Sequence, residues 1–168
     1  EGLPDRQVTS ILMDGAAVYV GTPLGVAEIR AGNVTRVLAP GYLAQSLAIR
    51  EGRLLVGPAE EGIVEAPLQA ASGRARRIGQ SCPRCSVSAF FATPSELLAV
   101  TPDRVLGVGA DSPSAALIAG SVSISDRNIS ALAFDRAGRL WIGYFDRGLD
   151  IWDAAANSVR HIENERVF

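Results

Sequence analysis

Short runs of alternating hydrophobic and polar residues recur along the whole chain. Residues 8–12 and 129–134 alternate with a period of two, and each run leads to a turn with Asp or Gly and then to an apolar run. Such patterns, bounded by turn residues, are typical of β-strands. The alanine-rich stretches at 68–71 and 154–156 are too short to form stable helices. The pattern therefore predicts an all-β protein.

The apolar runs belong to an internal repeat. In the first copy, residues 18–22 read VYVGT, and a second glycine follows at Gly25. Related runs occur at 54–63, 97–101 and 140–149. From one copy to the next the steps are 36, 43 and 43 residues, counted at Gly21, Gly57, Val100 and Gly143. A period near 40 residues with four short strands in each copy is typical of a β-propeller blade.

We expect residues 1–168 to form one β-propeller segment with about four blades of four antiparallel strands. The predicted blades span about 3–38, 39–79, 80–120 and 121–161, and residues 162–168 begin a fifth copy. An open ring would leave apolar faces uncovered, which soluble monomers rarely tolerate. We therefore expect the segment to be part of a larger ring in a longer chain. The alternatives are a ring that closes with a second copy of the chain and a compact ring of four blades.

The composition excludes several classes of protein. Of the 168 residues, 48% are hydrophobic and 20% are charged, which is typical of a folded domain and not of a disordered segment. The net charge of −2 gives no reason to expect a nucleic-acid partner. No apolar run approaches the roughly 20 residues that a membrane-spanning helix needs, so we expect no direct membrane insertion by this segment.

The chain has two cysteines, Cys82 and Cys85, in the stretch SCPRC. A thiol pair at this spacing can oxidise to a local disulfide or bind a soft metal. The pair occupies the crossing between two blades, at the place where the first copy has Leu3-Pro4-Asp5-Arg6. The chain has only one histidine to complete a zinc site, so we expect no metal. The remaining hypotheses are a disulfide or two free thiols.

The sequence offers little catalytic chemistry. The only histidine, His161, falls on the predicted outer strand of the fourth blade, away from the central channel. The Gly-x-Ser-x-Gly motif of hydrolases is absent from the sequence. We therefore expect no enzyme activity, no catalytic residues and no cofactor, and we interpret His161 as a solvated surface residue.

The best candidate for ligand contact is the loop that follows the strand of Trp141. It contains two aromatic side chains and a charge pair, at Tyr144, Phe145, Asp146 and Arg147. Aromatic faces next to charges suit the binding of a sugar or a peptide at a propeller mouth. Trp141 itself occupies the same position in its repeat as Tyr19, and we predict that both aromatic rings pack between neighbouring blades.

The first and fourth copies carry a family resemblance. Residues 3–26 contain LPDR, a DG turn, VYVGT and Gly25-Val26, and residues 124–149 contain ISDR, DRAG, LWIG and Gly148-Leu149. This form resembles the two-component-regulator propeller repeat. The resemblance implies an extracytoplasmic sensory propeller, often found ahead of a membrane helix and a histidine kinase in bacterial hybrid sensors. A periplasmic or extracellular location is expected, and a cytoplasmic one is the alternative.

The expected function is a non-catalytic, ligand-sensing propeller of a bacterial two-component sensor. Its partners would be a small molecule, a carbohydrate or a peptide, and either the remaining blades of the same propeller or a second copy. One alternative is a propeller enzyme, such as a lyase similar to the streptogramin-lyase propellers, with its catalytic residues in further blades. Another alternative is a protein-interaction scaffold.

Overall fold

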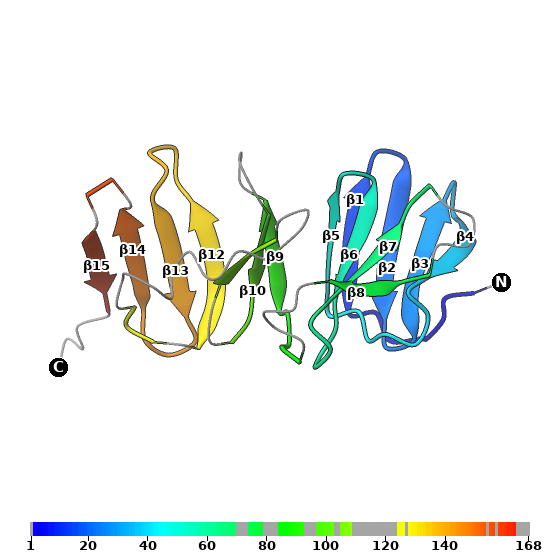
Figure 1. Cartoon of the computed structure of the whole chain (residues 1–168), viewed down its shortest axis with the longest axis horizontal. Helices are drawn as coiled ribbons and strands as arrows, with labels where there is room; N and C mark the ends of the chain where they lie inside the picture. The colour runs from blue at the N-terminus through cyan, green and yellow to red at the C-terminus, as the bar shows by residue number, and fades with distance from the viewer. Residues whose placement is uncertain are drawn as a thin grey trace. The chain divides into compact units, whose positions relative to one another are not determined.

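The computed structural model of the chain is built from β-strands that form antiparallel sheets (Figure 1). It describes residues 2–69, 74–78, 84–92, 97–102, 105–108, 124–126, 128–153, 155–156 and 158–163. Across these ranges no helix occurs. Consequently, the described part of the chain contains no helix that could cross a membrane. The prediction of an all-β propeller is confirmed.

Each sheet is one blade, and its strands follow one another in chain order. Blade 1 contains β1 (Ser10–Asp14), β2 (Ala17–Thr22), β3 (Gly25–Arg30) and β4 (Asn33–Leu38). Blade 2 contains β5 (Ser46–Arg50), β6 (Arg53–Gly57), β7 (Ile63–Pro67) and β8 (Arg76–Ile78). Such meanders need only tight turns between neighbouring strands, which agrees with the closely spaced turn residues of the sequence.

Blade 3 has three described strands, β9 (Ala89–Ala92), β10 (Leu97–Val100) and β11 (Val105–Val108). The fourth strand predicted for this blade falls within 109–123, outside the described residues. Blade 4 contains β12 (Ile129–Phe134), β13 (Leu140–Tyr144), β14 (Leu149–Asp153) and β15 (Ser158–Ile162). Ile162, where the sequence suggests the start of a fifth copy, lies at the end of β15, and 164–168 are outside the described residues.

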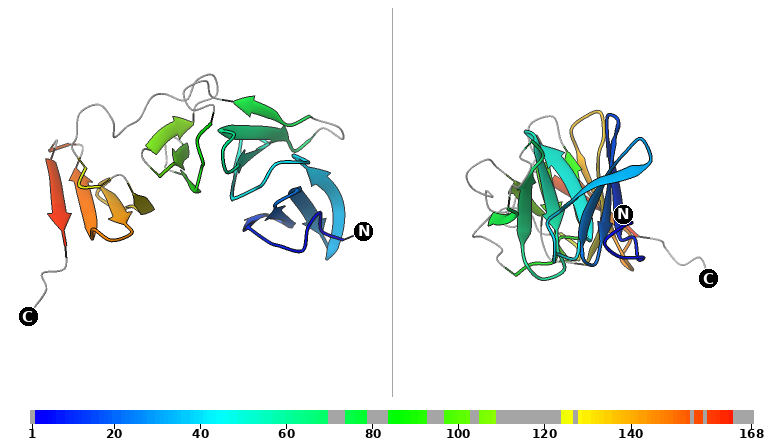
Figure 2. Two further views of the ribbon diagram at one scale, coloured as in Figure 1. Left: turned by 90° about the horizontal axis from the view of Figure 1, so that it is seen from below. Right: turned by 90° about the vertical axis from the view of Figure 1, so that its right-hand side faces the viewer.

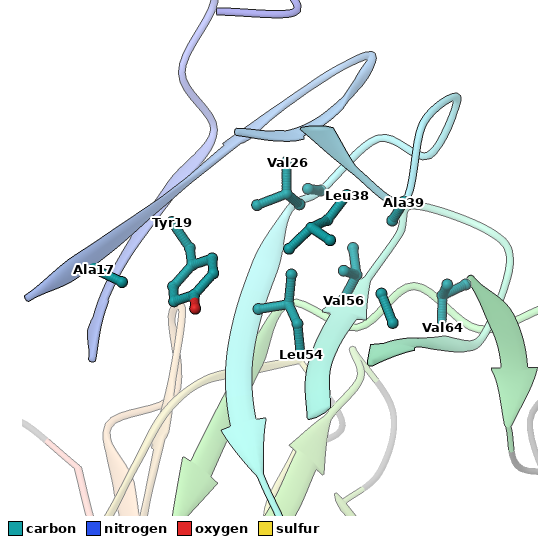
Figure 3. Close-up of a cluster of buried hydrophobic side chains, with 10 residues drawn as sticks. Ala17, Tyr19, Val26, Leu38, Ala39, Leu54, Val56 and Val64 are labelled. Carbon is teal, nitrogen blue, oxygen red and sulfur yellow. The ribbon is translucent and has the colours of Figure 1, made fainter. Parts of the chain in front are cut away.

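The chain divides into two compact units, the first ending at Phe90 and the second beginning at Phe91. In the first unit, blades 1 and 2 pack face to face around one apolar core (Figures 2 and 3). We call the surface of a blade that is turned to the following blade its trailing face, and the opposite surface its leading face. The trailing face of blade 1 contributes Ala17, Tyr19, Val26 and Leu38 to this core, and the leading face of blade 2 contributes Leu54, Val56, Val64 and Ala66.

The core explains part of the repeat. Tyr19 is 1% exposed and lies between the two sheets, as Figure 3 shows, so its predicted place between neighbouring blades is confirmed. Alternate residues of β2 and β3 enter the core because successive side chains of a strand point to opposite faces. Burial of large side chains at these positions supplies most of the stability of the packing.

The glycine at the end of each second strand has a steric reason. A Cβ atom at Gly21 would lie 2.7 Å from the carbonyl oxygen of Ala44, and one at Gly57 would lie 2.8 Å from that of Val87. In both cases the chain that leads into the next blade passes directly over the glycine. The repeated glycine is therefore required for close contact between consecutive blades.

Blades 1 and 2 each contain a buried ion cluster. Glu28 and Glu65 both lie three residues after a glycine at the start of, or just before, the third strand, and both carboxylates are buried. Each stands directly across from an arginine of the fourth strand, Arg36 or Arg76, and forms a salt bridge with it. Burial by itself raises the pKa of Glu28, but hydrogen bonds from Arg36 and Arg30 lower it below its ordinary value. The arginines therefore keep the buried Glu28 carboxylate ionised inside blade 1.

Candidate functional site

One end of each blade collects two kinds of loop. Because the strands are antiparallel, the start of β1 pairs with the end of β2, with Ser10 opposite Gly21. The chain that leads into the first strand therefore lies at the same end of the blade as the loop between the second and third strands. We call this the lead-in end and the residues just before each first strand the lead-in segment.

The first unit has a pocket at its lead-in end. The pocket has a volume of about 470 Å³ and is formed by the lead-in segments of three consecutive blades. The first segment contributes Gln7, Val8 and Thr9, the second contributes Leu43 and Gln45, and the third contributes Ser86 and Ser88. Segments that are distant in the sequence thus meet around one hollow.

The pocket residues occupy equivalent places in their repeats. The amide groups of Thr9 and Gln45 donate to the carbonyl oxygens of Gly21 and Gly57, at 2.9 and 3.0 Å, so Thr9 and Gln45 are equivalent. Further hydrogen bonds relate the second segment to the third. The Ser10 hydroxyl donates to the Ala44 carbonyl at 2.8 Å, and the Ser46 hydroxyl donates to the Val87 carbonyl at 2.7 Å. Ala44 and Val87 thus accept equivalent hydrogen bonds. The residues that follow them, Gln45 and Ser88, are therefore equivalent as well.

The chemistry of the pocket is uncharged and polar. Its lining combines amide and hydroxyl side chains with the apolar Val8 and Leu43. The Ser86 hydroxyl donates to Gln45 Oε1 at 2.9 Å, so the Gln45 amide is oriented by a neighbouring blade. Amide and hydroxyl groups both donate and accept hydrogen bonds. The arrangement can therefore bind neutral polar groups, with some apolar contact beside them.

The loop singled out from the sequence lies at the lead-in end of blade 4. The Phe145 amide donates to the carbonyl oxygen of Asn128, in the lead-in segment of that blade, at 3.3 Å. The Phe145 side chain is 73% exposed, and Asp146 is exposed beside it. Arg147 Nε lies 3.6 Å from Asp126 Oδ2. Phe145, Asp146 and Arg147 are thus available to solvent, and their role in ligand binding remains a prediction.

Tyr144 has a different environment from its three neighbours. It is the last residue of β13, its side chain is buried, and its hydroxyl donates to Asp150 Oδ2 at 2.7 Å. Burial, together with this hydrogen bond to a carboxylate, raises the pKa of Tyr144 above its ordinary value. The hydroxyl is therefore occupied within the blade, and the side chain serves as a support for the loop.

Asp150 is the centre of a buried hydrogen-bond network that the sequence analysis missed. Its carboxylate is 0% exposed and accepts four hydrogen bonds, each 2.7 Å long, from the Tyr144 hydroxyl, the Ser125 amide, the Ser125 hydroxyl and His161 Nδ1. Burial raises the pKa of Asp150, but these donors outweigh burial and lower it below its ordinary value. One ionised carboxylate thus connects the lead-in segment of blade 4 with three of its strands.

His161 lies at the surface, as the sequence predicted, but it also belongs to this network. It stands directly across from Asp150 in the β14–β15 ladder, and its side chain is 32% exposed. Its other ring nitrogen, Nε2, lies 3.5 Å from Glu163 Oε2. The sequence feature that could have indicated this network is an aspartate at an inward-facing strand position, opposite the only histidine of the chain.

The His161 pair predicts a pH-dependent contribution to stability. The hydrogen bond to Asp150 raises the pKa of His161 above 6.5, its ordinary value. A raised pKa means that the stabilisation is fully present below about pH 6.5 and is lost as the pH rises through the folded-state value. The free energy of unfolding of the wild type should therefore fall relative to that of His161→Gln as the pH rises. Urea unfolding at several values between about pH 5.5 and 8.5 measures this difference, and equal slopes for the two proteins would contradict it.

The predicted disulfide lies partly outside the described residues. Cys85 is disulfide-bonded and is half-buried, whereas Cys82 is outside the described part of the chain. The Cys85 carbonyl accepts a hydrogen bond from the Gly62 amide at 3.1 Å, which places it next to the β6–β7 loop of blade 2. The Cys82–Cys85 pairing remains a prediction. Among the residues with described positions, no three His, Cys, Asp or Glu side chains are arranged to hold a metal ion.

Comparison with protein families identifies one repeat. A family model described as the two-component regulator propeller matches residues 123–146, which include β12 and β13. This match confirms the resemblance expected from the sequence in the fourth copy. No curated protein gives a significant match to the chain.

Solved structures define the class of protein. The chain is similar to the extracellular domain of a protein described as a hybrid two-component system of B. thetaiotaomicron, with a TM-score of 0.76 and 18% identity. It is also similar to the β-propeller domain of Cps50 (Swd1) of Myceliophteria thermophila, with a TM-score of 0.68 and 19% identity. These likenesses establish a β-propeller fold. The family model adds that residues 123–146 of this propeller form a two-component-regulator propeller repeat.

The matched structures are longer than this chain. The aligned region covers 96% of the chain but 23% of the B. thetaiotaomicron hybrid-system protein. For a second extracellular domain, from a one-component system of the same organism, the values are 97% and 25%, with a TM-score of 0.69 and 14% identity. The chain therefore spans about a quarter of the length of these two ectodomains.

Proposed function

We propose that the chain is a ligand-sensing, non-catalytic part of an extracytoplasmic propeller in a bacterial two-component sensor. The family model supports the signalling context, and two of the similar structures are extracellular domains of signalling proteins. The observation that carries the proposal is the pocket formed by three equivalent lead-in segments. Loops and lead-in segments at one end of a rigid scaffold are the usual place for ligand contacts.

The ligand we propose is an uncharged polar molecule, a carbohydrate or a peptide. The pocket lining contains amides, hydroxyls and aliphatic side chains and includes no ionisable side chain. A charged ligand would lose hydration in such a pocket without gaining a counter-charge. In blade 4, the exposed Phe145 ring offers an apolar face at the same end of the blade, with Arg147 beside it.

The contacts of the His161 imidazole support a non-catalytic role. Its Nδ1 is bonded to a buried carboxylate, and its Nε2 lies near Glu163. A general base needs a nitrogen within reach of the proton that it removes from a substrate or nucleophile. Both ring nitrogens of His161 instead face carboxylates of its own blade, which is the arrangement of a structural residue.

Binding experiments test the proposal with one variant in the pocket of the first unit and one in the Phe145 loop of blade 4. Isothermal titration of neutral oligosaccharides and uncharged peptides should yield at least one ligand for the wild type. Gln45→Ala removes one oriented amide and should weaken that binding about tenfold, the effect of about one lost hydrogen bond. Phe145→Ala tests the exposed loop of blade 4 as a separate candidate site. Gln69→Ala changes an exposed glutamine at the opposite end of blade 2 and should leave the affinity unchanged.

The outcomes show whether the ligand binds in the pocket of the first unit or at the loop of blade 4. If Gln45→Ala has no effect while Phe145→Ala weakens binding, the ligand lies at blade 4 and the pocket assignment is wrong. If neither variant changes the affinity of a bound ligand, the lead-in end is not the binding end. Tyr144→Ala is unsuitable for this purpose because it disturbs the Asp150 network.

A further inference from the structure

We propose that the disulfide bond of Cys85 controls one wall of the pocket in the first unit, so that a dithiol reductant loosens this wall when it opens the bond. The wall is the third lead-in segment, which contributes Ser86 and Ser88 to the pocket. Cys85 is disulfide-bonded and directly precedes Ser86. As a regulation of ligand binding, this control rests on the proposed function, whereas its structural part can be measured without a ligand.

The second lead-in segment shows how a wall of the pocket is held without a disulfide. The Ala44 amide donates to the Thr22 carbonyl oxygen at 3.0 Å. The Ala44 carbonyl oxygen accepts hydrogen bonds from two hydroxyl groups, those of Thr9 at 2.6 Å and Ser10 at 2.8 Å. These hydrogen bonds fasten the middle of the second segment to blade 1.

The third lead-in segment is held less firmly by the equivalent bonds. The Val87 amide donates to the Pro58 carbonyl oxygen at 3.4 Å, which is longer than the roughly 3.2 Å limit of ordinary N–H···O bonds. Among the described residues, the Val87 carbonyl oxygen accepts one side-chain hydrogen bond, from the Ser46 hydroxyl at 2.7 Å. The second hydroxyl of the preceding blade is replaced by the side chain of Gln45, which bonds to Ser86. One anchoring bond is thus lost and another is weakened.

Cys85 stands where the second segment has a different anchor. Counted back from Ala44 and Val87, the equivalent of Cys85 is Tyr42, which packs against the apolar core of the first unit. The Cys85 carbonyl oxygen accepts from the Gly62 amide at 3.1 Å, so its backbone lies against the β6–β7 loop. A disulfide limits the conformations that the chain around it can adopt. In the third segment a covalent bond therefore takes the place of aromatic packing.

The constraint at Cys85 reaches the pocket within one residue. Val87 is 0% exposed and lies so close over Gly57 that it stays fixed in either redox state. Ser86 lies between this fixed residue and Cys85, and its hydroxyl donates to Gln45 Oε1 at 2.9 Å. When the disulfide is open, Ser86 is held firmly on one side only. The Gln45 amide then loses the bond that orients it in the pocket.

The chemical step is a thiol–disulfide exchange. A dithiol gives two electrons and two protons to the protein disulfide, the S–S bond of Cys85 breaks, and the dithiol closes to its own disulfide. The protein gains two thiols, at Cys85 and at its bonding partner. Cys82 is the only other cysteine in the chain and is the partner that the composition offers. Because Cys85 is half-buried and not enclosed, a small dithiol can reach it from solvent.

Amide hydrogen exchange, followed by NMR before and after treatment with dithiothreitol, tests the structural part of the proposal. The Gly62 and Val87 amides should exchange at least about tenfold faster in the reduced protein, because the disulfide no longer limits local opening. The Ala44 amide, which is the equivalent of the Val87 amide in the segment without a disulfide, should exchange at an unchanged rate. Equal rates in the oxidised and reduced proteins at Gly62 and Val87 would overturn the proposal.

Two variants connect the exchange rates with the pocket. Cys85→Ser cannot form the disulfide, so it should exchange like the reduced wild type and should not respond to dithiothreitol. Ser86→Ala keeps the disulfide but lacks the hydroxyl that orients Gln45. Its side-chain amide signals of Gln45 therefore serve as the reference for an unoriented amide. On reduction, the Gln45 signals of the wild type should move toward this reference, and signals that stay in place would contradict control of the pocket.

The redox experiment and the ligand titrations fail independently. If the neutral oligosaccharides and uncharged peptides do not bind but reduction changes the exchange at Gly62 and Val87, the proposed function is wrong and the control by Cys85 stands. If one of these probes binds but reduction changes neither the exchange rates nor the Gln45 signals, the control by Cys85 is wrong and the proposed function stands.

Discussion

Asp150→Ala is expected to destabilise the second unit by about 3–5 kcal/mol, the usual cost of removing one member of a buried, hydrogen-bonded charge network. The carboxylate is fully buried and accepts all four hydrogen bonds of the network. Its removal leaves the Tyr144 hydroxyl and the Ser125 amide without acceptors in a space that water does not readily fill. Urea unfolding, followed by the fluorescence of the tryptophans Trp141 and Trp152, measures the change.

Two further variants give this prediction its controls. Asp150→Asn keeps the shape of the side chain and one carbonyl acceptor, so its effect should lie between those of the wild type and the alanine variant. Asp146→Ala removes an exposed carboxylate from the same blade and should change the free energy of unfolding by less than about 0.5 kcal/mol. An alanine variant at position 150 that is as stable as Asp146→Ala would show that the network contributes nothing.

Gly148→Ala should have the second large effect, about 2–5 kcal/mol of destabilisation. Gly148 has a φ of +64°, a left-handed conformation that costs a residue with a Cβ atom about 1–2 kcal/mol. The added Cβ would also collide with the Ile162 carbonyl oxygen and lie 3.0 Å from the Cα atom of Glu163. Relief of such overpacking typically costs about 1–3 kcal/mol more. Thermal and urea unfolding measure the loss.

The chain supplies a matched control for this glycine. Gly138 also has a positive φ, +78°, but an added Cβ there meets no atom within 4 Å. Gly138→Ala should therefore show only the conformational part of the cost, about 1–2 kcal/mol. If the two alanine variants lose equal stability, the contact between the Gly148 turn and the end of β15 has no energetic weight.

Most of the fold could be predicted because its signals are local. The strands follow from period-two alternation, and the turns follow from glycine and aspartate at fixed offsets, all within a few neighbouring residues. The repetition of this pattern then indicates blades, since one unit cannot bury its apolar faces alone. The buried place of Tyr19 also followed from its repeat position.

The candidate site could be predicted only in part. Phe145, Asp146 and Arg147 are exposed at the end of a strand, as a loop with mixed chemistry suggests. Tyr144 has the same chemistry in the sequence but a different environment, because the strand continues through it and its hydroxyl meets Asp150. The pocket of the first unit was missed because Gln7, Gln45 and Ser86 are far apart in the chain and carry no common motif.

The sequence by itself determined the class of fold, the blade repeat and its resemblance to a signalling family, since all three are written in the periodic spacing of apolar residues and glycines. Only the tertiary structure decided which polar groups act together. The partners of Asp150 come from 6 to 25 residues away along the chain, and a strand register had to bring His161 across from it before either residue had a role. Burial makes such contacts strong, and burial is a property of the packed blades and not of any short stretch of sequence.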